Sequence, residues 1–226
     1  MSRKTKPAKK KVLIVDDHPM MRQGLAQLIN SEKDLAVCCE ANTARQAFEA
    51  VSKSRPDIAL VDISLPDQSG LEFIKDVHAT YPELPVLVVS MHDESLYAER
   101  VLRAGGRGYI MKQEGGQKFM EAIRRVLSGQ IYVSEKISEN ILELFSGRKP
   151  GAIGSPVERL TDREFEVFQL IGQGGGTREI AERLHLSVKT IEVHRANVKK
   201  KLKLKNATDL VHYAVRWIDA HGGQPS

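Results

Sequence analysis

Cysteine and long hydrophobic runs are both scarce in this chain. Its two cysteines, Cys38 and Cys39, are adjacent, and neighbouring residues of a strand point to opposite faces. We therefore expect no stapling disulfide and a reducing compartment. No apolar run approaches the roughly 18 residues of a membrane span, and the basic start of the chain leads into only a short apolar stretch, unlike a secretory signal. These absences exclude disulfide-rich secreted proteins and membrane-spanning proteins, and they indicate a cytoplasmic location.

The length and composition are those of a globular protein with more than one domain. The chain has 226 residues, of which 41% are hydrophobic and 28% are charged. A chain of this length predicts two domains, and this hydrophobic content is enough to fill their cores.

Charge is distributed unevenly along the chain. Residues 1–11 contain six Lys or Arg and no acid, and we expect them to be a basic disordered arm. Residues 12–133 contain 13 bases and 17 acids, whereas residues 159–226 contain 12 bases and 8 acids. The basic C-terminal part is a candidate for binding phosphate backbones, although charges of this size also serve simply to solvate a surface. Whether the arm contacts DNA is left open by the sequence.

Short apolar runs alternate with segments of helical periodicity over residues 12–130. This alternation predicts an α/β doubly wound domain with a five-stranded parallel sheet covered on both faces. The expected strands are Val12–Val15, Leu35–Cys39, Asp57–Val61, Val86–Val89 and Arg107–Ile110.

The pattern changes after Gly129. Residues 131–156 have the composition of a linker that contains one helix, predicted over Ser134–Phe145. Residues 157–222 show helical segments and no strand pattern, which predicts a smaller all-α domain.

Five polar residues follow the predicted strands at their carboxyl ends. Asp16 and Asp17 follow the first strand, Asp62 the third, Ser90 the fourth and Lys112 the fifth. Open α/β sheets bind ligands at this edge. One such aspartate is usually a turn or helix cap, but five polar residues at one edge indicate a site.

This set of residues suggests phosphoryl transfer. Neighbouring carboxylates repel each other unless a cation neutralises them, and an all-oxygen site favours Mg²⁺. The Lys112 ammonium and the Ser90 hydroxyl suit phosphoryl oxygens, and a carboxylate can act as the nucleophile. His18 and His92 are interpreted as residues without a role as metal ligands.

The last seventy residues predict a helix-turn-helix. Thr161 and Glu164 form a capping-box pattern before the first helix, and a short turn at residues 185–187 leads into a basic helix. In that helix Ile191 and Val198 fall on one buried stripe. An exposed Val and Ala lie among charges on its opposite face, which is typical of a helix that enters the major groove. A helical bundle that docks another protein is the alternative.

The first domain resembles the receiver domain of two-component response regulators. The resemblance rests on the motifs VLIVDDHPMMRQGL, LVDISLPDQSG, VLVVSMHDE and GGRGYIMKQ. It implies that Asp62 is the phosphoacceptor and that Lys112 binds the phosphoryl group. It also implies that Ser90 and Tyr109 are a switch pair. The implied ligands of Mg²⁺ are Asp16, Asp17, Asp62 and the backbone carbonyl of Ser64.

The C-terminal domain resembles the DNA-binding domain of the LuxR/NarL/FixJ class. The matching segments are LTDREFEVFQLIGQG and TREIAERLHLSVKTIEVHRANVKKKLKL, and the run Gly-Gly-Gly-Thr-Arg at 174–178 departs from the family pattern. Trp217 is assigned equally to the core and to a dimer contact. The residues that this resemblance places at DNA are Lys189, Thr190, Glu192, Val193, Arg195, Ala196 and Lys199.

Together these resemblances predict a bacterial transcription regulator that is controlled by phosphorylation and is not an enzyme. The expected partners are a sensor histidine kinase, a double-stranded DNA operator and, when active, a second copy of the chain. RNA polymerase is a further candidate partner, and no membrane is expected. The alternatives are a constitutive DNA-binding regulator whose receiver is never phosphorylated and a magnesium-dependent aspartyl-phosphate phosphatase of the haloacid dehalogenase class. Such phosphatases carry their nucleophile at the first strand, whereas the isolated aspartate here follows the third.

Overall fold

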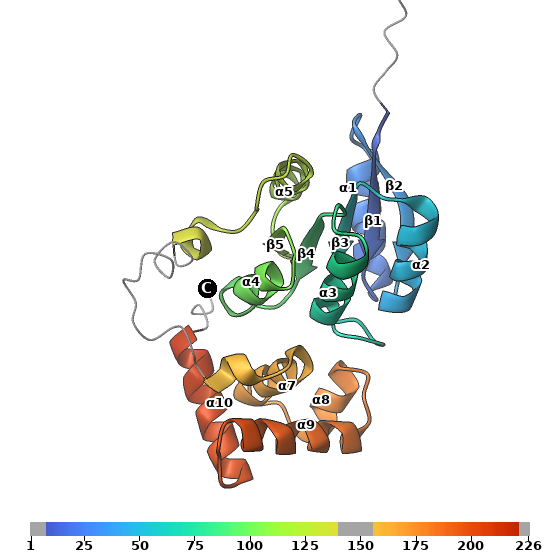
Figure 1. Ribbon diagram of the computed structural model, residues 1–226. Coiled ribbons are helices and arrows are strands. Elements are labelled where there is room, and N and C mark those ends of the chain that lie inside the picture. Colours follow the sequence, from blue (N-terminus) through green and yellow to red (C-terminus); the bar gives the residue numbers. More distant parts are fainter. Residues whose placement is uncertain (1–7, 140–155, 222–226) are drawn as a thin grey trace, which may run out of the picture. The chain divides into compact units, whose positions relative to one another are not determined.

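The structure, a computed structural model, describes residues 8–139 and 156–221 (Figure 1). The chain divides into two compact units, one built around a sheet and one built from the C-terminal helices. None of the helices within these described ranges has the length and hydropathy needed to cross a membrane.

The N-terminal unit contains a five-stranded parallel sheet with the strand order β2-β1-β3-β4-β5. This confirms the predicted doubly wound sheet, and each strand begins and ends within two residues of its predicted bounds. The strands are β1 (Lys10–Val15), β2 (Leu35–Ala41), β3 (Ile58–Val61), β4 (Val86–Ser90) and β5 (Gly108–Met111). β3 and β4 are buried along their whole length, as expected of strands covered on both faces.

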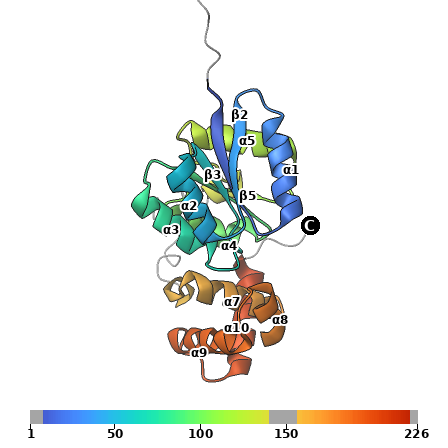
Figure 2. The ribbon, with the colours of Figure 1, turned by 90° about the vertical axis from the view of Figure 1, so that its right-hand side faces the viewer.

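Helices follow the strands as the periodicity predicts. α2 and α3 lie on one side of the sheet and α1 on the other (Figure 2). The first turns of α2 and α3 are capped by the side chains of Thr43 and Ser69. The helices of this unit are α1 (Pro19–Asn30), α2 (Ala44–Ser54), α3 (Gly70–Thr80), α4 (Glu94–Arg103) and α5 (Gly116–Leu127).

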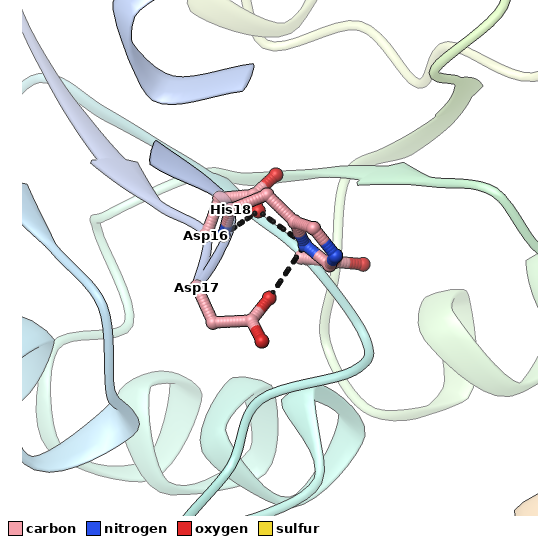
Figure 3. A group of neighbouring side chains, drawn as sticks. Asp16, Asp17 and His18 are labelled. Atoms are coloured by element: carbon pink, nitrogen blue, oxygen red, sulfur yellow. Dashed lines mark hydrogen bonds and ion pairs between the residues drawn. The ribbon is translucent and has the colours of Figure 1, made fainter. Parts of the chain in front are cut away.

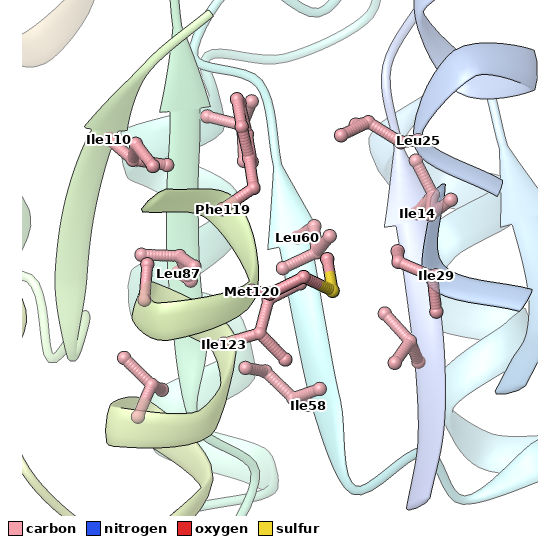
Figure 4. Packing of buried hydrophobic residues seen from close by; sticks show 14 of the residues in the cluster. Ile14, Leu25, Ile29, Ile58, Leu60, Leu87, Ile110, Phe119, Met120 and Ile123 are labelled. Atoms are coloured by element: carbon pink, nitrogen blue, oxygen red, sulfur yellow. The ribbon is translucent and has the colours of Figure 1, made fainter. Parts of the chain in front are cut away.

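The core beneath α1 and α5 fixes the strands that carry the site. Phe119 and Ile123 of α5 pack with Ile29 of α1 against Ile14 of β1 and Leu60 of β3 (Figure 4). Each of these side chains is at most 3% exposed. Burying a side chain of this size contributes about 1.5–3 kcal/mol. The neighbouring strands β1 and β3 are thereby held so that their carboxyl ends stay side by side.

Lys10 and Lys11 belong to β1 and not to a disordered arm, so that part of the prediction is wrong. The backbone of Lys10 donates to Asp34, and that of Lys11 donates to the Asp57 carboxylate at 2.7 Å. Lys10 Nζ also lies 2.8 Å from Asp57. These partners come from distant segments, which a local charge pattern does not reveal. Residues 1–7 of the predicted arm lie outside the described residues.

The two cysteines do not point to opposite faces, and that premise is also wrong. Val12 pairs with Val37 and Leu13 pairs with Cys39, so Cys38 is the extra residue of a β-bulge. The bulge breaks the strand alternation and brings the two Sγ atoms to 3.0 Å, with both thiols free.

Contacts of the sheet continue past the predicted boundary at residue 130. The backbone of Tyr132 bridges to Gly108, and Tyr109 donates its N–H to the Tyr132 carbonyl at 2.8 Å. Residues 135–139 are helical, in agreement with the start of the predicted linker helix. The rest of that helix, from residue 140, lies outside the described residues.

The C-terminal unit is helical throughout its described part, as predicted. Thr161 and Glu164 form the expected capping box, and Asn206 caps the last helix through the N–H of Asp209. Thr177 is not the cap of its helix. Gly176 occupies that position with an extended backbone, and the Glu179 carboxylate accepts its N–H at 3.4 Å. The elements are η1 (Pro156–Arg159), α7 (Asp162–Gly172), α8 (Thr177–Arg183), α9 (Val188–Lys201) and α10 (Ala207–His221).

Candidate functional site

Three carboxylates meet at the carboxyl edge of the sheet. β1 ends at Val15 and β3 ends at Val61, so Asp16, Asp17 and Asp62 follow neighbouring strands. The Asp62 N–H donates to the Val15 carbonyl at 2.8 Å, which fixes the two strand ends together. Asp16 and Asp62 are each 2% exposed, whereas Asp17 is closer to solvent.

Lys112 joins this group from the end of β5. Its Nζ lies 2.7 Å from Asp62 Oδ2 and 2.7 Å from Asp16 Oδ2. The Lys112 N–H donates to the Ser90 carbonyl, which sets the direction of the side chain. One ammonium thus bridges two buried carboxylates at the edge where the strand-end pattern places all three residues.

The electrostatics of the site follow from this arrangement. Burial raises the pKa of Asp62, and Asp16 adds repulsion, while Lys112 opposes both effects. Burial alone would lower the pKa of Lys112, but the two carboxylates outweigh it and raise that pKa. Lys112 therefore stays protonated between the two carboxyl groups.

His18 lies at this edge as well (Figure 3). Its Nδ1 is 2.7 Å from Asp17 Oδ1 and 3.2 Å from Asp16 Oδ1, and its N–H donates to Asp16 Oδ1. The imidazole itself is two-thirds exposed. His18 is thus the surface residue at the start of α1 that the sequence predicts, but it also covers the two carboxylates.

The loop after β3 is shaped around Asp62 by Gly70. A Cβ at Gly70 would lie 2.3 Å from the Asp62 carbonyl oxygen, and the Gly70 N–H donates to the Ile63 carbonyl at 2.7 Å. No larger residue fits this close approach. Ser64, in the same loop, donates its N–H to Asp62 Oδ1 at 3.3 Å.

The predicted switch residues share one partner, His92. Ser90 is fully buried, and its Oγ accepts the His92 N–H at 3.2 Å. The Tyr109 hydroxyl donates to the His92 carbonyl at 2.8 Å, and the His92 ring nitrogen Nε2 lies 2.9 Å from Ser64 Oγ. His92 therefore links the Ser90 and Tyr109 positions to the loop of Asp62, a role that the sequence analysis missed.

The donor set fits a hard divalent cation. Asp16, Asp17, His18 and Asp62 each place one ligand atom within 4.8 Å of the others. Three of these four donors are carboxylates, which Mg²⁺ prefers, and the described cluster contains no thiolate. The closeness of three acidic side chains is the electrostatic reason that such an ion would bind here, because a cation relieves their mutual repulsion.

Two further residues support the site and were not identified from the sequence. Arg22 of α1 donates to the Asp16 carbonyl at 2.6 Å. Asp67 accepts the N–H groups of Ala44 and Arg45, which ties the loop after β3 to the start of α2. Arg22 follows Asp16 by six residues and lies in the first turns of α1, so it is close enough in sequence for such a contact. Nothing local in the sequence indicates that Asp67 contacts residues 22 and 23 positions away.

The second candidate site is the helix-turn-helix of α8 and α9. His185 in the turn has φ +52°, and Leu186 donates its N–H to the Ala181 carbonyl, which closes the turn. Ser187 caps α9 through the Thr190 N–H at 3.0 Å. As predicted, Ile191 and Val198 of α9 are fully buried.

The opposite face of α9 is open to solvent. Val193 is 53% exposed, so an apolar side chain lies among the charged residues of this face. Of the residues predicted to contact DNA, Lys189, Glu192, Val193 and Ala196 are exposed, while Thr190, Arg195 and Lys199 are partly buried. The Thr190 hydroxyl lies 2.7 Å from Ser187 Oγ, within the cap of the helix.

Helix α7 packs against α9 and α10. Arg163 donates to the Leu184 carbonyl, and Lys201 Nζ lies 2.6 Å from Glu164 Oε2. Trp217 of α10 is partly exposed and packs edge-on against Phe168 at 5.7 Å between ring centroids, which does not decide between its two predicted roles. His194 of α9 is partly buried in this unit, and this burial lowers its pKa.

Comparison with known proteins gives a family match for each domain. Residues 12–124 match the response regulator receiver domain. Residues 158–214 match the bacterial regulatory proteins of the luxR family.

Relatives and solved structures match the whole of this chain or a large part of it. The chain is 34% identical over 210 residues to the oxygen regulatory protein NreC of Staphylococcus haemolyticus. These residues cover 91% of this chain and 97% of that protein. RcsB from Salmonella enterica serovar Typhimurium, solved bound to the promoter rprA with the phosphomimetic BeF3⁻, is 24% identical. It has a TM-score of 0.61 over 92% of this chain and 98% of that one, and it shows the shared fold. A LuxR-family response regulator from Aurantimonas is 29% identical, with a TM-score of 0.57 over 62% of this chain and 99% of its own. The chain therefore belongs to the two-component response regulators that carry a LuxR-type helix-turn-helix domain.

Proposed function

We propose that Asp62 accepts a phosphoryl group from a histidine kinase and that this modification controls DNA binding by α9. The observation that carries the proposal is the position of Lys112 Nζ, 2.7 Å from both Asp62 and Asp16. A buried carboxylate held beside an ammonium and two further carboxylates suits a nucleophile for phosphoryl transfer.

Each residue of the site has a distinct part in the transfer. Asp62 attacks the phosphorus in line, and the bond to the donor breaks. Lys112 neutralises the charge that develops on the phosphoryl oxygens, since an ammonium placed in advance needs no reorganisation. The Ser90 hydroxyl can then turn from the His92 N–H to a phosphoryl oxygen, and Tyr109 follows because both residues bond to His92.

Mg²⁺ is the cofactor that we propose for this step. Asp16, Asp17, Asp62 and the Ser64 backbone carbonyl would hold it, and when bound it would offset the negative charge of the carboxylates and the phosphoryl group. The His18 imidazole contacts both Asp16 and Asp17 and would have to move away from them when the ion binds.

DNA recognition is assigned to the open face of α9. Lys189, Thr190, Arg195 and Lys199 would contact phosphates, and Glu192, Val193 and Ala196 would contact base edges. A homodimer on operator half-sites is supported by the solved structure of two RcsB dimers bound to two parallel DNAs. RNA polymerase is a candidate partner at the promoter.

We propose that the chain works in the bacterial cytoplasm as a regulator and not as an enzyme. Its curated relatives of similar length are regulatory proteins. The domain bounds that we propose are a receiver over residues 10–133, a linker over 134–156 and a DNA-binding domain over 157–222.

Intact mass spectrometry after incubation with Mg²⁺ and an acyl phosphate tests the proposal. We expect one phosphoryl adduct per wild-type chain, no adduct for Asp62→Asn, and an unchanged adduct for the control Asp76→Asn, an exposed carboxylate on α3. An adduct that survives Asp62→Asn contradicts the assignment. If neither an acyl phosphate nor a histidine kinase modifies the wild type, the constitutive regulator replaces this account. Steady turnover of a phosphate monoester would support the phosphatase.

A further inference from the structure

We propose that Cys38 and Cys39 form a bidentate dithiol site for a trivalent arsenical. This site lies on β2 and is independent of the proposed phosphorylation chemistry. The β-bulge at Cys38 places the two Sγ atoms 3.0 Å apart, and both side chains are partly exposed on a strand at the edge of the sheet.

The backbone favours chelation over a disulfide. Adjacent Cα atoms lie about 3.8 Å apart across a trans peptide, whereas disulfides usually join Cα atoms about 4.4–6.8 Å apart. A bond between these sulfurs would therefore be strained and easily reduced. A bound arsenic atom bridges the two sulfurs without this strain, because each sulfur bonds to arsenic and not to the other sulfur.

The number and spacing of the nearby ligands determine which metal or metalloid the two thiols can bind. Among the described residues, the only cluster of three or more His, Cys, Asp or Glu ligands is the one around Asp16, so this dithiol offers two ligands and no third. A structural zinc site needs four ligands. Two-coordinate soft ions prefer ligands on opposite sides, which two sulfurs 3.0 Å apart do not provide. Trivalent arsenic is pyramidal, and a monosubstituted arsenical forms two bonds to sulfur at an acute to right angle.

The reaction that forms this site balances with the two thiols and the arsenical alone. Burial, together with contact with Cys39, raises the pKa of Cys38 to about 12, so Cys38 enters as the thiol and gives up its proton as its bond to arsenic forms. An arsenic oxide, R–As=O, condenses with two thiols. Two As–S bonds form, the As–O bond breaks, and the two thiol protons leave with the oxygen as water. No atom is oxidised or reduced, so the step needs no further reagent.

Intact mass spectrometry of the reduced full-length protein with phenylarsine oxide tests the site. We expect one phenylarsenic group per wild-type chain, retained in excess monothiol and released by a 1,2-dithiol such as dimercaptopropanol. The chain has no other cysteine, so Cys38→Ser, Cys39→Ser and the double variant complete the series. Each single variant should lose the group at a monothiol concentration about 100-fold lower, because the second bond of a chelate forms at a high effective concentration.

Two results would overturn the proposal. One is a wild-type chain that binds two arsenicals, or none, after full reduction. The other is a single variant that retains the group as firmly as the wild type. The wild-type stoichiometry and the dithiol competition need no variant, so they decide the question even where a serine disturbs the bulge. Acyl phosphate labelling of Asp62 is not part of the readout, so failure here leaves the proposed function standing.

Discussion

At the scale of single residues, the close approach of Gly70 to Asp62 gives the first prediction. Gly70→Ala places a Cβ 2.3 Å from the Asp62 carbonyl, so the loop must move. We expect the free energy of unfolding to fall by about 1–3 kcal/mol and acyl phosphate labelling to slow. Gly24→Ala is the matched control, because its Cβ meets nothing within 4 Å and it lies inside α1. It should be neutral or stabilising by up to about 1 kcal/mol. Equal behaviour of the two variants in urea unfolding would refute the argument.

The charge of Asp62 gives the second prediction. Its pKa is raised by burial and by Asp16, so ionising the carboxylate costs stability; this cost is full above the folded pKa and is lost as the pH falls from the folded to the unfolded pKa. Asp62→Asn leaves Lys112 paired with Asp16. At pH 7 with a chelator of Mg²⁺, the variant should therefore be more stable than the wild type by about 1 kcal/mol.

Magnesium should narrow the difference in unfolding free energy between Asp62→Asn and the wild type, since ligand binding stabilises the folded wild type. Urea unfolding of both proteins with and without Mg²⁺ measures the effect. A variant that is less stable than the wild type in the chelator would show that Asp62 is a net stabilising partner of Lys112.

At the scale of elements, Glu164 ties α7 to α9. Burial opposes ionisation of Glu164, but hydrogen bonds from Lys201 and the Thr161 N–H outweigh it and lower the pKa. A lowered pKa stabilises the fold above the unfolded pKa, and that stabilisation is lost as the pH falls through the folded pKa. Glu164→Gln should cost about 1–2 kcal/mol at pH 7. Its difference from the wild type should shrink below about pH 4. Trp217 fluorescence follows unfolding of this unit, and a difference that is independent of pH contradicts the assignment.

The start of α10 provides a comparison between two neighbouring polar residues. Asn206 accepts the Asp209 N–H at 2.8 Å, whereas Thr208 is exposed within the first turn. Asn206→Ala should cost about 1 kcal/mol, as loss of a helix cap does, and Thr208→Ala only a few tenths. Thermal unfolding measures both, and the reverse order would show that the cap is misassigned.

Elements with a local signal could be predicted from the sequence. The strands are short apolar runs, and Thr161 with Glu164 is a pattern within four residues, so both are found as expected. Features that depend on partners distant in sequence could not be predicted. β1 begins at Lys10 because Asp34 and Asp57 accept hydrogen bonds from the backbone N–H groups of Lys10 and Lys11. The bulge at Cys38 is visible only in the pairing of β2 with β1.

The candidate site shows the same division. Asp16, Asp17, Asp62 and Lys112 could be predicted because strand ends of a parallel sheet share an edge. The contacts of His92 could not, since they join residues 17 and 28 positions apart.

At the scale of the whole molecule, α9 should read DNA with two kinds of residue. Lys189→Ala removes an exposed charge, so binding should weaken similarly on all sequences, and the slope of affinity against salt should fall by about 1. Glu192→Gln should instead alter the difference in binding free energy between bases at one operator position by about 1–3 kcal/mol. Lys53→Ala, an exposed charge on α2, is the control and should change neither. Fluorescence anisotropy over a salt series measures the slopes, and a sequence-dependent effect of Lys189→Ala would reverse these roles.

The central claim is that phosphorylation at Asp62 controls DNA binding, and a comparison of affinities tests it most directly. An operator is first selected from genomic fragments with the protein treated with acyl phosphate and Mg²⁺. The Kd for this operator is then measured with and without the phosphodonor, for the wild type and for Asp62→Asn. The account predicts that phosphorylation tightens wild-type binding by about tenfold or more and leaves Asp62→Asn unchanged. An equal Kd for the wild type in both conditions, at full phosphorylation by intact mass, would contradict it.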